Sequence, residues 1–317
     1  MTKFEFRRLK IEDGAFSLNF ALRTSNFLGV DVGGTTTRVG LVSPGGEVLW
    51  ADRFPTPRAA AGLLDRITDR VSSLQPSNGL TAGLGVALPG LVDRARGVLV
   101  RSVNLPFLEE FPIVEELARR TLLRAVLLTD AEAATWGEFW ACDPPTGQFI
   151  HLRFGTGIAC GVVLRGELQP ADEVRRTHLP ALVVDDRADA PVCPCGLRGC
   201  LELYAGGSAI ARHPIEESAG WIVRGIGNLV GHLPLDPPPH GRGSEGRVAP
   251  APRSDVDAEP VVVCLGGGVL ASAPDLFPRV CKRWAERTSA VRWNAELRLA
   301  RLGDDAGVTG AAMLAGR

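Results

Sequence analysis

Short apolar runs, each closed by glycine or a polar turn, alternate along the chain with longer amphipathic segments. Such runs are typical of buried strands, whereas apolar positions three and four residues apart are typical of helices packed on one face. Strands are predicted at residues 27–32, 38–42, 48–54, 80–88, 125–128, 261–265 and 296–301, with two more flanking residues 155–157. Helices are predicted at residues 58–74, 113–120, 131–140, 208–213, 216–233, 274–288 and 308–315. The alternation predicts an α/β protein.

Two similar strand–glycine–strand units, one near Gly33 and one near Gly155, indicate two similar lobes that face one cleft. The 317 residues are enough for two domains of ordinary size. The expected boundaries are an N-terminal extension at residues 1–26, an N-terminal lobe at 27–129 completed by a C-terminal helix at 304–317, and a C-terminal lobe at 130–303. Residues 235–257 are rich in Pro, Gly, Ser and Arg, which is typical of an exposed insertion.

Composition and charge disfavour several classes of protein. With 45% hydrophobic residues the chain can bury full cores, and its net charge of −1 gives no bias toward nucleic acid or an anionic membrane. The seven cysteines are odd in number and three of them lie within eight positions, which favours a cytosolic metal-binding protein over a secreted disulfide framework. No apolar run approaches membrane-spanning length, and residues 1–24 lack a signal-peptide core. We therefore expect a cytoplasmic protein with no nucleic-acid or membrane partner.

Glycine loops supply the candidate phosphate contacts. Asp31 ends a strand and is followed by Gly33, Gly34, Thr35 and Thr36. Glycines let backbone amides approach phosphate oxygens, the threonines add hydroxyl donors, and the carboxylate can hold Mg²⁺ through water. The alternative is an ordinary hairpin turn. A second loop, formed by Gly155, Thr156 and Gly157, is a weak signal alone, but with the first it fits a clamp on the phosphates of ATP. A third glycine run follows a buried strand, at Gly266, Gly267 and Gly268.

Asp130 is the candidate general base, because it follows a buried strand directly, at the end where open α/β sheets bind ligands. A carboxylate there can accept the proton of a hydroxyl group that attacks the γ-phosphate of ATP. The alternative is structural, since either Asp130 or Thr129 could cap the helix that follows.

A dense cysteine cluster predicts a zinc site. Cys193, Cys195 and Cys200, with His178 upstream, can complete a tetrahedral site in which four protein ligands leave no open position. Such a closed site is structural rather than catalytic. The alternatives are buried free cysteines or a redox pair.

The cluster also carries a family resemblance. The pattern C-x-C-G-x-x-G-C-x-E after an upstream His resembles the signature of the ROK family of sugar kinases and repressors. Further stretches match that family from about residue 27 to the C-terminus: 88–93, 104–106, 130–131, 155–157, 261–268 and 309–312. The three glycine loops likewise resemble the phosphate and adenosine motifs of the actin-like ATPase superfamily. That resemblance implies two ribonuclease H-like lobes around a central cleft, with a zinc-binding loop at residues 178–202.

The resemblance also implies roles for residues. Asn104, Asp130, His178 and Glu202 are expected to contact the sugar, with Asp130 as the base. Family kinases usually carry a Glu three residues before the metal-binding His, where this chain has Arg175; Glu173 could replace it only if the loop is rearranged. Family members commonly carry an Asn directly before the catalytic Asp and often a second Asn two positions after it. This chain has Thr129 and Glu132 at those positions. These changes alter the hydrogen bonding of the sugar pocket.

The expected activity is ATP-dependent phosphorylation of a hexose, with glucose as the first candidate and the 6-hydroxyl as the acceptor. ATP, Mg²⁺ and a structural Zn²⁺ are the expected cofactors, and the family resemblance implies a dimer or tetramer. Two alternatives remain: a non-catalytic sugar-binding protein, or a kinase for an N-acetylhexosamine, mannose, fructose or allose. A DNA-binding repressor is disfavoured, because only about 26 residues precede the first strand, too few for a helix-turn-helix module.

Overall fold

The computed structural model describes residues 25–74, 81–142, 147–171, 182–232, 260–288 and 294–317. The chain divides into unit 1, which comprises Met1–Pro144 and Arg301–Arg317, and unit 2, which comprises Pro145–Ala300. Among the described residues, no helix has both the length and the apolar character that a membrane span requires. The predicted insertion at residues 235–257 and the extension up to Thr24 lie outside the described residues.

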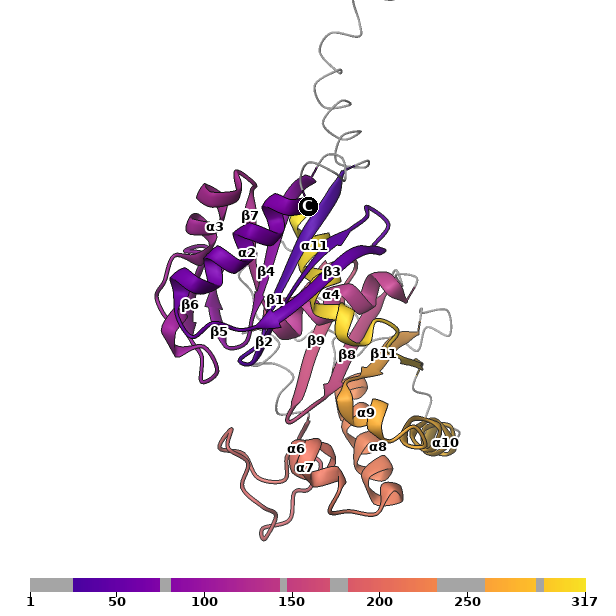
Figure 1. Cartoon of the computed structure of the whole chain (residues 1–317). Helices are drawn as coiled ribbons and strands as arrows, with labels where there is room; N and C mark the ends of the chain where they lie inside the picture. The colour runs from indigo at the N-terminus through magenta and orange to yellow at the C-terminus, as the bar shows by residue number, and fades with distance from the viewer. Residues whose placement is uncertain (1–24, 75–80, 143–146, 172–181, 233–259, 289–293) are drawn as a thin grey trace, which may run out of the picture. The chain divides into compact units, whose positions relative to one another are not determined.

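Each unit is built on a five-stranded mixed sheet (Figure 1). In unit 1 the order is β3-β2-β1-β4-β7, formed by β1 (Asn26–Val32), β2 (Thr36–Val42), β3 (Val48–Pro55), β4 (Thr81–Leu88) and β7 (Ala125–Thr129). In unit 2 it is β10-β9-β8-β11-β12, formed by β8 (Gln148–Phe154), β9 (Ile158–Leu164), β10 (Glu167–Leu168), β11 (Val261–Gly266) and β12 (Ala295–Leu299). In both sheets the first three strands along the chain pair antiparallel and the last two add in parallel, so the topology is the same.

Helices cover both faces of the first sheet. Leu28 and Val30 of β1 face the apolar sides of α2 (Ala60–Leu74) and α3 (Ile113–Thr121). The alternate positions of β1 face α11 (Ala306–Ala315), which packs in turn against α4 (Asp130–Ala141). The helix lies directly on the strand backbone, because a Cβ added at Gly29 would come within 1.9 Å of the Val308 carbonyl oxygen. β1 is therefore buried on both faces, which explains its continuous apolar run.

The packing of α4 places the boundary between the two units later in the chain than the sequence predicted. A Cβ added at Gly310 of α11 would lie 1.7 Å from the Ala133 carbonyl oxygen of α4, so the two helices are in backbone contact. The structure consequently places α4 in unit 1, whereas the expected C-terminal lobe began at residue 130. The C-terminal helix also lies in unit 1.

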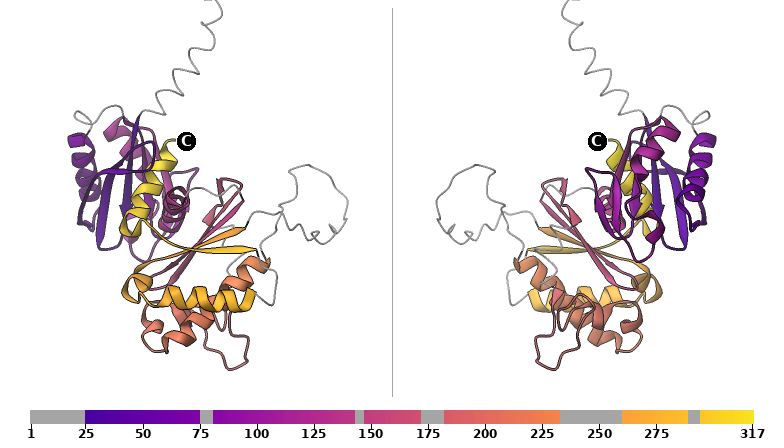
Figure 2. Two further views of the ribbon diagram at one scale, coloured as in Figure 1. Left: turned by 90° about the vertical axis from the view of Figure 1, so that its right-hand side faces the viewer. Right: turned by 90° about the vertical axis from the view of Figure 1, so that its left-hand side faces the viewer.

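In unit 2, the apolar faces of α8 (Ile215–His232) and α10 (Leu276–Thr288) pack on one side of the sheet (Figure 2). Short helices α6 (Glu202–Ala205), α7 (Gly207–Ile210) and α9 (Gly268–Ser272) lie among the loops. The predicted helix at residues 208–213 is shorter than expected. The hairpin of β5 (Leu91–Asp93) and β6 (Val98–Arg101) and the 3₁₀ turns η1 (Pro106–Leu108) and η3 (Gly303–Asp305) were not predicted.

Candidate active site and thiolate loop

The loop after Asp31 is a tight turn between β1 and β2 that exposes its hydroxyl groups. The amide of Gly33 donates to the Thr36 carbonyl at 2.9 Å, and the Thr56 hydroxyl donates to the Gly33 carbonyl at 2.7 Å. Thr35 and Thr36 are exposed. The turn is thus held from behind while its outer donors face solvent, which is the arrangement that oxygen-rich anions require.

Asp31 lies beneath this turn, at the first turn of α11. A Cβ added at Gly307 would come within 2.3 Å of the Asp31 Oδ2 atom, so the glycine is needed for the carboxylate to reach the helix N-terminus. Arg38, which pairs with Asp31 across the strands, forms an ion pair with Asp305 before the same helix. The positive end of the helix dipole favours a carboxylate at this position.

Asn104 lies beside the glycine turn. The Asn104 Cβ atom would be 3.1 Å from a Cβ added at Gly34, and the Asn104 backbone amide donates to the Ser102 hydroxyl at 3.3 Å. The Ser102 backbone amide in turn donates a hydrogen bond to the Glu109 carboxylate at 2.8 Å. The structure therefore brings together Asn104 and the Gly33–Thr36 turn, which are about 70 residues apart in the sequence.

Asp130 does not cap α4. Thr129 is the N-cap, and its hydroxyl accepts the Glu132 amide at 3.1 Å while the Glu132 carboxylate accepts the Thr129 amide at 2.8 Å. This is a complete capping box. Of the two caps that the sequence left open, the structure has Thr129. Asp130 occupies the first helical position, half-buried, at the same edge of the sheet as Asp31.

Glu132 is a buried carboxylate with two roles. It is 3% exposed, completes the capping box, and forms an ion pair at 2.5 Å with Arg94 of the β5–β6 hairpin. The pair ties the hairpin to the first turn of α4, next to Asp130. The sequence reasoning did not identify Arg94. The signal it could have used was Glu132, a charged residue inside an apolar helix, which requires a partner.

The glycine turn of unit 2 packs on Glu202. The Gly155 amide donates to the Gly157 carbonyl at 2.9 Å, and the Ile158 amide donates to Glu202 Oε2 at 2.8 Å. A Cβ added at Gly157 would lie 2.5 Å from that same oxygen. Glu202 therefore supports this turn directly, in addition to the sugar contact expected of it.

Further glycines surround the turn. Gly207 donates to the Gly155 carbonyl at 2.7 Å, and a Cβ added at Gly267 would lie 2.3 Å from the Phe154 carbonyl oxygen. Gly267 has a φ of +99°, which favours glycine. The runs at residues 155–157 and 266–268 thus lie side by side, at the ends of adjacent strands β8 and β11. The sequence reasoning missed Gly206 and Gly207, although two adjacent glycines after the cysteine cluster were a visible signal.

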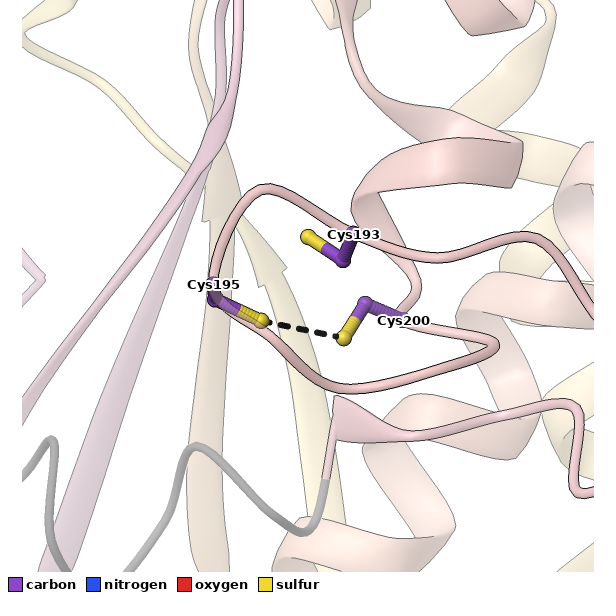
Figure 3. Close-up of side chains that lie close together, drawn as sticks. All are labelled: Cys193, Cys195 and Cys200. Atoms are coloured by element: carbon purple, nitrogen blue, oxygen red, sulfur yellow. Dashed lines mark hydrogen bonds between the residues drawn. The ribbon is translucent and has the colours of Figure 1, made fainter.

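Cys193, Cys195 and Cys200 converge within one loop, called here the thiolate loop (residues 193–200; Figure 3). Their Sγ atoms all lie within 4.8 Å of one another, and those of Cys195 and Cys200 are 3.5 Å apart. Burial raises the pKa of the Cys193 and Cys200 thiols, whereas a backbone hydrogen bond from Leu197 lowers the pKa of Cys195.

These separations fit one zinc ion. Tetrahedral ligands with Zn–S bonds of about 2.3 Å place their sulfur atoms roughly 3.8 Å apart. The tight wrap of the loop depends on glycine, because Gly196 and Gly199 have φ values of +93° and +67°. Glu173, Arg175 and His178, which complete the sequence-based predictions here, lie outside the described residues.

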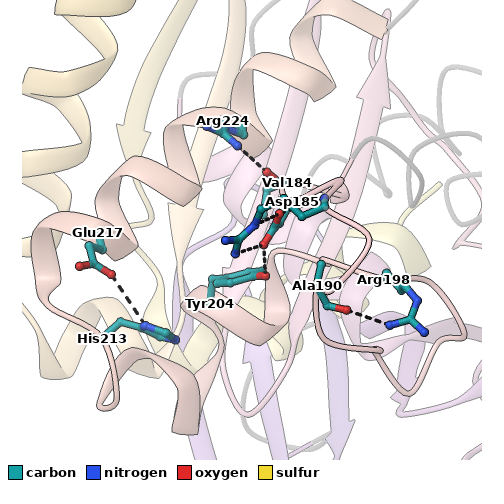
Figure 4. A network of polar contacts seen from close by, with 9 residues as sticks. Val184, Asp185, Ala190, Arg198, Tyr204, His213, Glu217 and Arg224 are labelled. Carbon is teal, nitrogen blue, oxygen red and sulfur yellow. Dashed lines mark hydrogen bonds and ion pairs between the residues drawn. The ribbon is translucent and has the colours of Figure 1, made fainter.

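A polar network centred on the buried Asp185 carboxylate reaches Tyr204 of α6 (Figure 4). The Asp185 carboxylate accepts the Tyr204 hydroxyl at 2.6 Å and two guanidinium hydrogen bonds from Arg187 at 2.8 and 2.9 Å. These partners, Arg187 first, hold the pKa of Asp185 well below its usual range. Burial, and then the hydrogen bond to Asp185, raise the pKa of Tyr204 to about 12. The Tyr204 ring stacks on Trp221 with centroids 4.5 Å apart.

Comparison with known proteins agrees with the architecture. The ROK family model matches residues 27–237. A glucokinase of Thermotoga maritima is 36% identical over 58% of this chain and 58% of its own length. A glucokinase of Halalkalibacterium halodurans and an N-acetylmannosamine kinase of Escherichia coli are each 28% identical over 91% of this chain, covering 94% and 97% of their lengths. The crystal structure of a ROK hexokinase from Thermus thermophilus superposes with a TM-score of 0.70 at 26% identity, covering 92% of this chain and 97% of that one.

Proposed function

The chain belongs to the ROK family, and from that premise we propose that it is a sugar kinase, which transfers the γ-phosphoryl group of ATP to a hexose hydroxyl, with Asp130 as the general base. The relatives named glucokinase and N-acetylmannosamine kinase support the activity class. A solved ROK glucokinase from Streptomyces griseus, in complex with glucose and AMPPNP, shares the fold at 22% identity, with a TM-score of 0.63 over 92% of this chain and 99% of that one.

The observation that carries the proposal is the position of Asp130. Thr129 and Glu132 form the capping box, so Asp130 is not the N-cap, and its Oδ1 atom accepts the Ala131 backbone amide at 2.9 Å, which fixes the carboxylate at the first turn of α4. It lies at the carboxyl edge of the sheet, where β1, β4 and β7 end in parallel and where the Asp31 loop also begins. A carboxylate at such an edge can take the proton of the sugar hydroxyl as the hydroxyl attacks phosphorus.

The nucleotide contacts are assigned to the glycine turns. The Gly33–Thr36 turn offers exposed hydroxyls and backbone amides to phosphate oxygens, and the runs at residues 155–157 and 266–268 form a glycine-lined surface in unit 2. Asp31 is the residue suited to hold Mg²⁺ through water, because it is a half-buried carboxylate behind the first turn. When bound, Mg²⁺ would neutralise charge on the transferred phosphoryl group.

The sugar contacts are assigned to Asn104, Glu202 and Asp130. Asn104 supplies an exposed amide beside Gly34, and Glu202 supplies a carboxylate on α6. A structural Zn²⁺ in the thiolate loop would keep the segment leading into Glu202 in place, because Cys200 and Glu202 are separated by a single residue. Glucose and its 6-hydroxyl are the first substrate and acceptor that we propose.

Substitution of Asp130 by Asn tests the proposal. The amide keeps the size of the side chain but cannot accept the hydroxyl proton, so we expect sugar-dependent ADP release to fall by about 10²–10⁴-fold. A coupled ADP assay measures this, and Asp69→Asn on the exposed face of α2 is the matched control, expected to be fully active. Turnover unchanged in Asp130→Asn would exclude Asp130 as the base. Sugar binding by calorimetry with no ADP release from the wild-type protein would favour the non-catalytic sugar-binding protein instead.

A further inference from the structure

Asp185 holds two segments of unit 2 that are separate in the sequence. The amides of Val184 and Asp185 donate to the Gly199 carbonyl at 2.8 and 3.1 Å, and a Cβ added at Gly199 would lie 1.7 Å from the Asp185 carbonyl oxygen. The backbone of Asp185 is thus in direct contact with the thiolate loop. The Asp185 side chain accepts a hydrogen bond from the Tyr204 hydroxyl at 2.6 Å (Figure 4).

Tyr204 connects Asp185 to the glycine turn of unit 2. It lies on the four-residue helix α6 together with Glu202, so a movement of the helix backbone that shifts Tyr204 also shifts Glu202. Stacking on Trp221 fixes the ring, and the hydroxyl group has its partner in Asp185. Glu202 then accepts the Ile158 amide and lies against Gly157. A continuous series of contacts therefore runs from the thiolate loop to residues 155–158.

We infer that Asp185 and Tyr204 are positioning residues that couple the thiolate loop to Glu202 and to the glycine turn that Glu202 supports. The inference rests on the proposed function, in which the loop holds zinc and Glu202 contacts the sugar. Asp185 is 2% exposed and Tyr204 6%, so their hydrogen bond is shielded from water and holds a single arrangement. Because binding linkage is reciprocal, zinc in the loop strengthens sugar binding and sugar strengthens zinc retention by the same factor.

Arg187 provides a matched control. It donates to both oxygens of the same Asp185 carboxylate and also interacts with the Tyr204 hydroxyl, but its side chain is 65% exposed and it is not part of the series of contacts that runs from Asp185 through Tyr204 to Glu202. If the carboxylate served only as a local charge partner, Arg187→Ala and Tyr204→Phe would have similar effects. If it serves as the coupling element, only Tyr204→Phe breaks the series, since it removes the hydroxyl and keeps the stacked ring.

Hydrogen exchange at the Ile158 amide reports the coupling without any substrate. We would measure exchange by mass spectrometry for a peptide that covers residues 155–160, in protein loaded with zinc and in protein stripped by a chelator. In the wild type we expect zinc removal to speed exchange of this peptide by about fivefold or more, within the usual range of coupling between sites. In Tyr204→Phe, and in the second variant Asp185→Asn, exchange should be fast with or without zinc, whereas Arg187→Ala should behave as the wild type.

Two results would overturn the inference: a wild-type exchange rate at residues 155–160 that does not depend on zinc, including the case of a protein that takes up none, or a Tyr204→Phe variant that keeps the full zinc effect. Kinetics then separate the inference from the proposed function. We expect Tyr204→Phe to raise the KM for sugar about tenfold with a smaller change in kcat. A protein that shows the zinc-dependent exchange but phosphorylates no hexose retains the coupling and contradicts the proposed function alone.

Discussion

At the scale of single residues, His151 predicts how stability depends on pH. It lies in the middle of β8, is 3% exposed, and has its pKa lowered to about 3 by burial and, second, by the charge of Arg153. An unfolded chain binds a proton at this side chain near pH 6.5, whereas the folded chain does not until about pH 3. Stability is therefore lost as pH falls below about 6.5, by up to about 1.4 kcal/mol per pH unit.

Replacement of His151 by Gln should remove that part of the pH dependence. We expect the free energy of unfolding of the wild type, measured with urea, to fall more steeply between pH 7 and pH 5 than that of His151→Gln. His213→Gln is the control, because His213 is half-buried, lies two residues before helix α8 of unit 2, and has its Nδ1 atom 3.9 Å from the Glu217 carboxylate. Parallel curves for the wild type and His151→Gln would show that burial does not lower the pKa of His151 in the folded state.

At the scale of elements, the first turn of α4 depends on Arg94. The Arg94→Ala variant would remove the Arg94 guanidinium from the buried Glu132 carboxylate, and the loss of one partner of a buried ion pair is costly. Because Arg94 is 37% exposed and water can partly replace it, we expect a loss of about 2 kcal/mol in the free energy of unfolding. Arg94→Lys should recover part of it.

Arg96→Ala is the control for Arg94→Ala, since it removes an arginine from the same hairpin. Its partner Glu110 is 54% exposed, so the change should have little effect on stability. Equal losses in the two variants would mean that the hairpin as a whole, and not the buried pair, supports α4.

The same helix shows which part of the structure the sequence could predict. The end of β7 and the start of α4 follow from an apolar run closed by Thr129 and Asp130, and the Glu three residues after Thr129 is the capping-box signature that would have chosen between the two caps. Arg94 could not be predicted, because it lies 38 positions from Glu132 and only the folded hairpin brings them together. The same is true of Asp185 and Tyr204, and of Gly29 and Val308.

At the scale of the whole molecule, the two sheets repeat one topology and the same position of a glycine turn. Each places its glycine turn between the first two strands of the sheet, at Gly33–Thr36 in unit 1 and at residues 155–157 in unit 2. This repetition was predictable, since both turns follow an apolar strand. The unit boundary was not, because it depends on which sheet α4 covers, and that is decided by its contact with a helix at the far end of the chain.

The chain resembles both a glucokinase and an N-acetylmannosamine kinase over 91% of its length, so the sugar and its acceptor hydroxyl have to be identified by experiment. We expect ADP release with glucose or another hexose from a panel that includes mannose, fructose, allose and N-acetylmannosamine. For the best substrate, the 6-deoxy analogue should inhibit competitively, with a dissociation constant within about tenfold of the substrate's, because it loses one hydroxyl contact. It should release no ADP, because it lacks the group that Asp130 would deprotonate. ADP release with the 6-deoxy sugar would move the acceptor to another hydroxyl group, and a panel without any active sugar would point to a non-hexose acceptor.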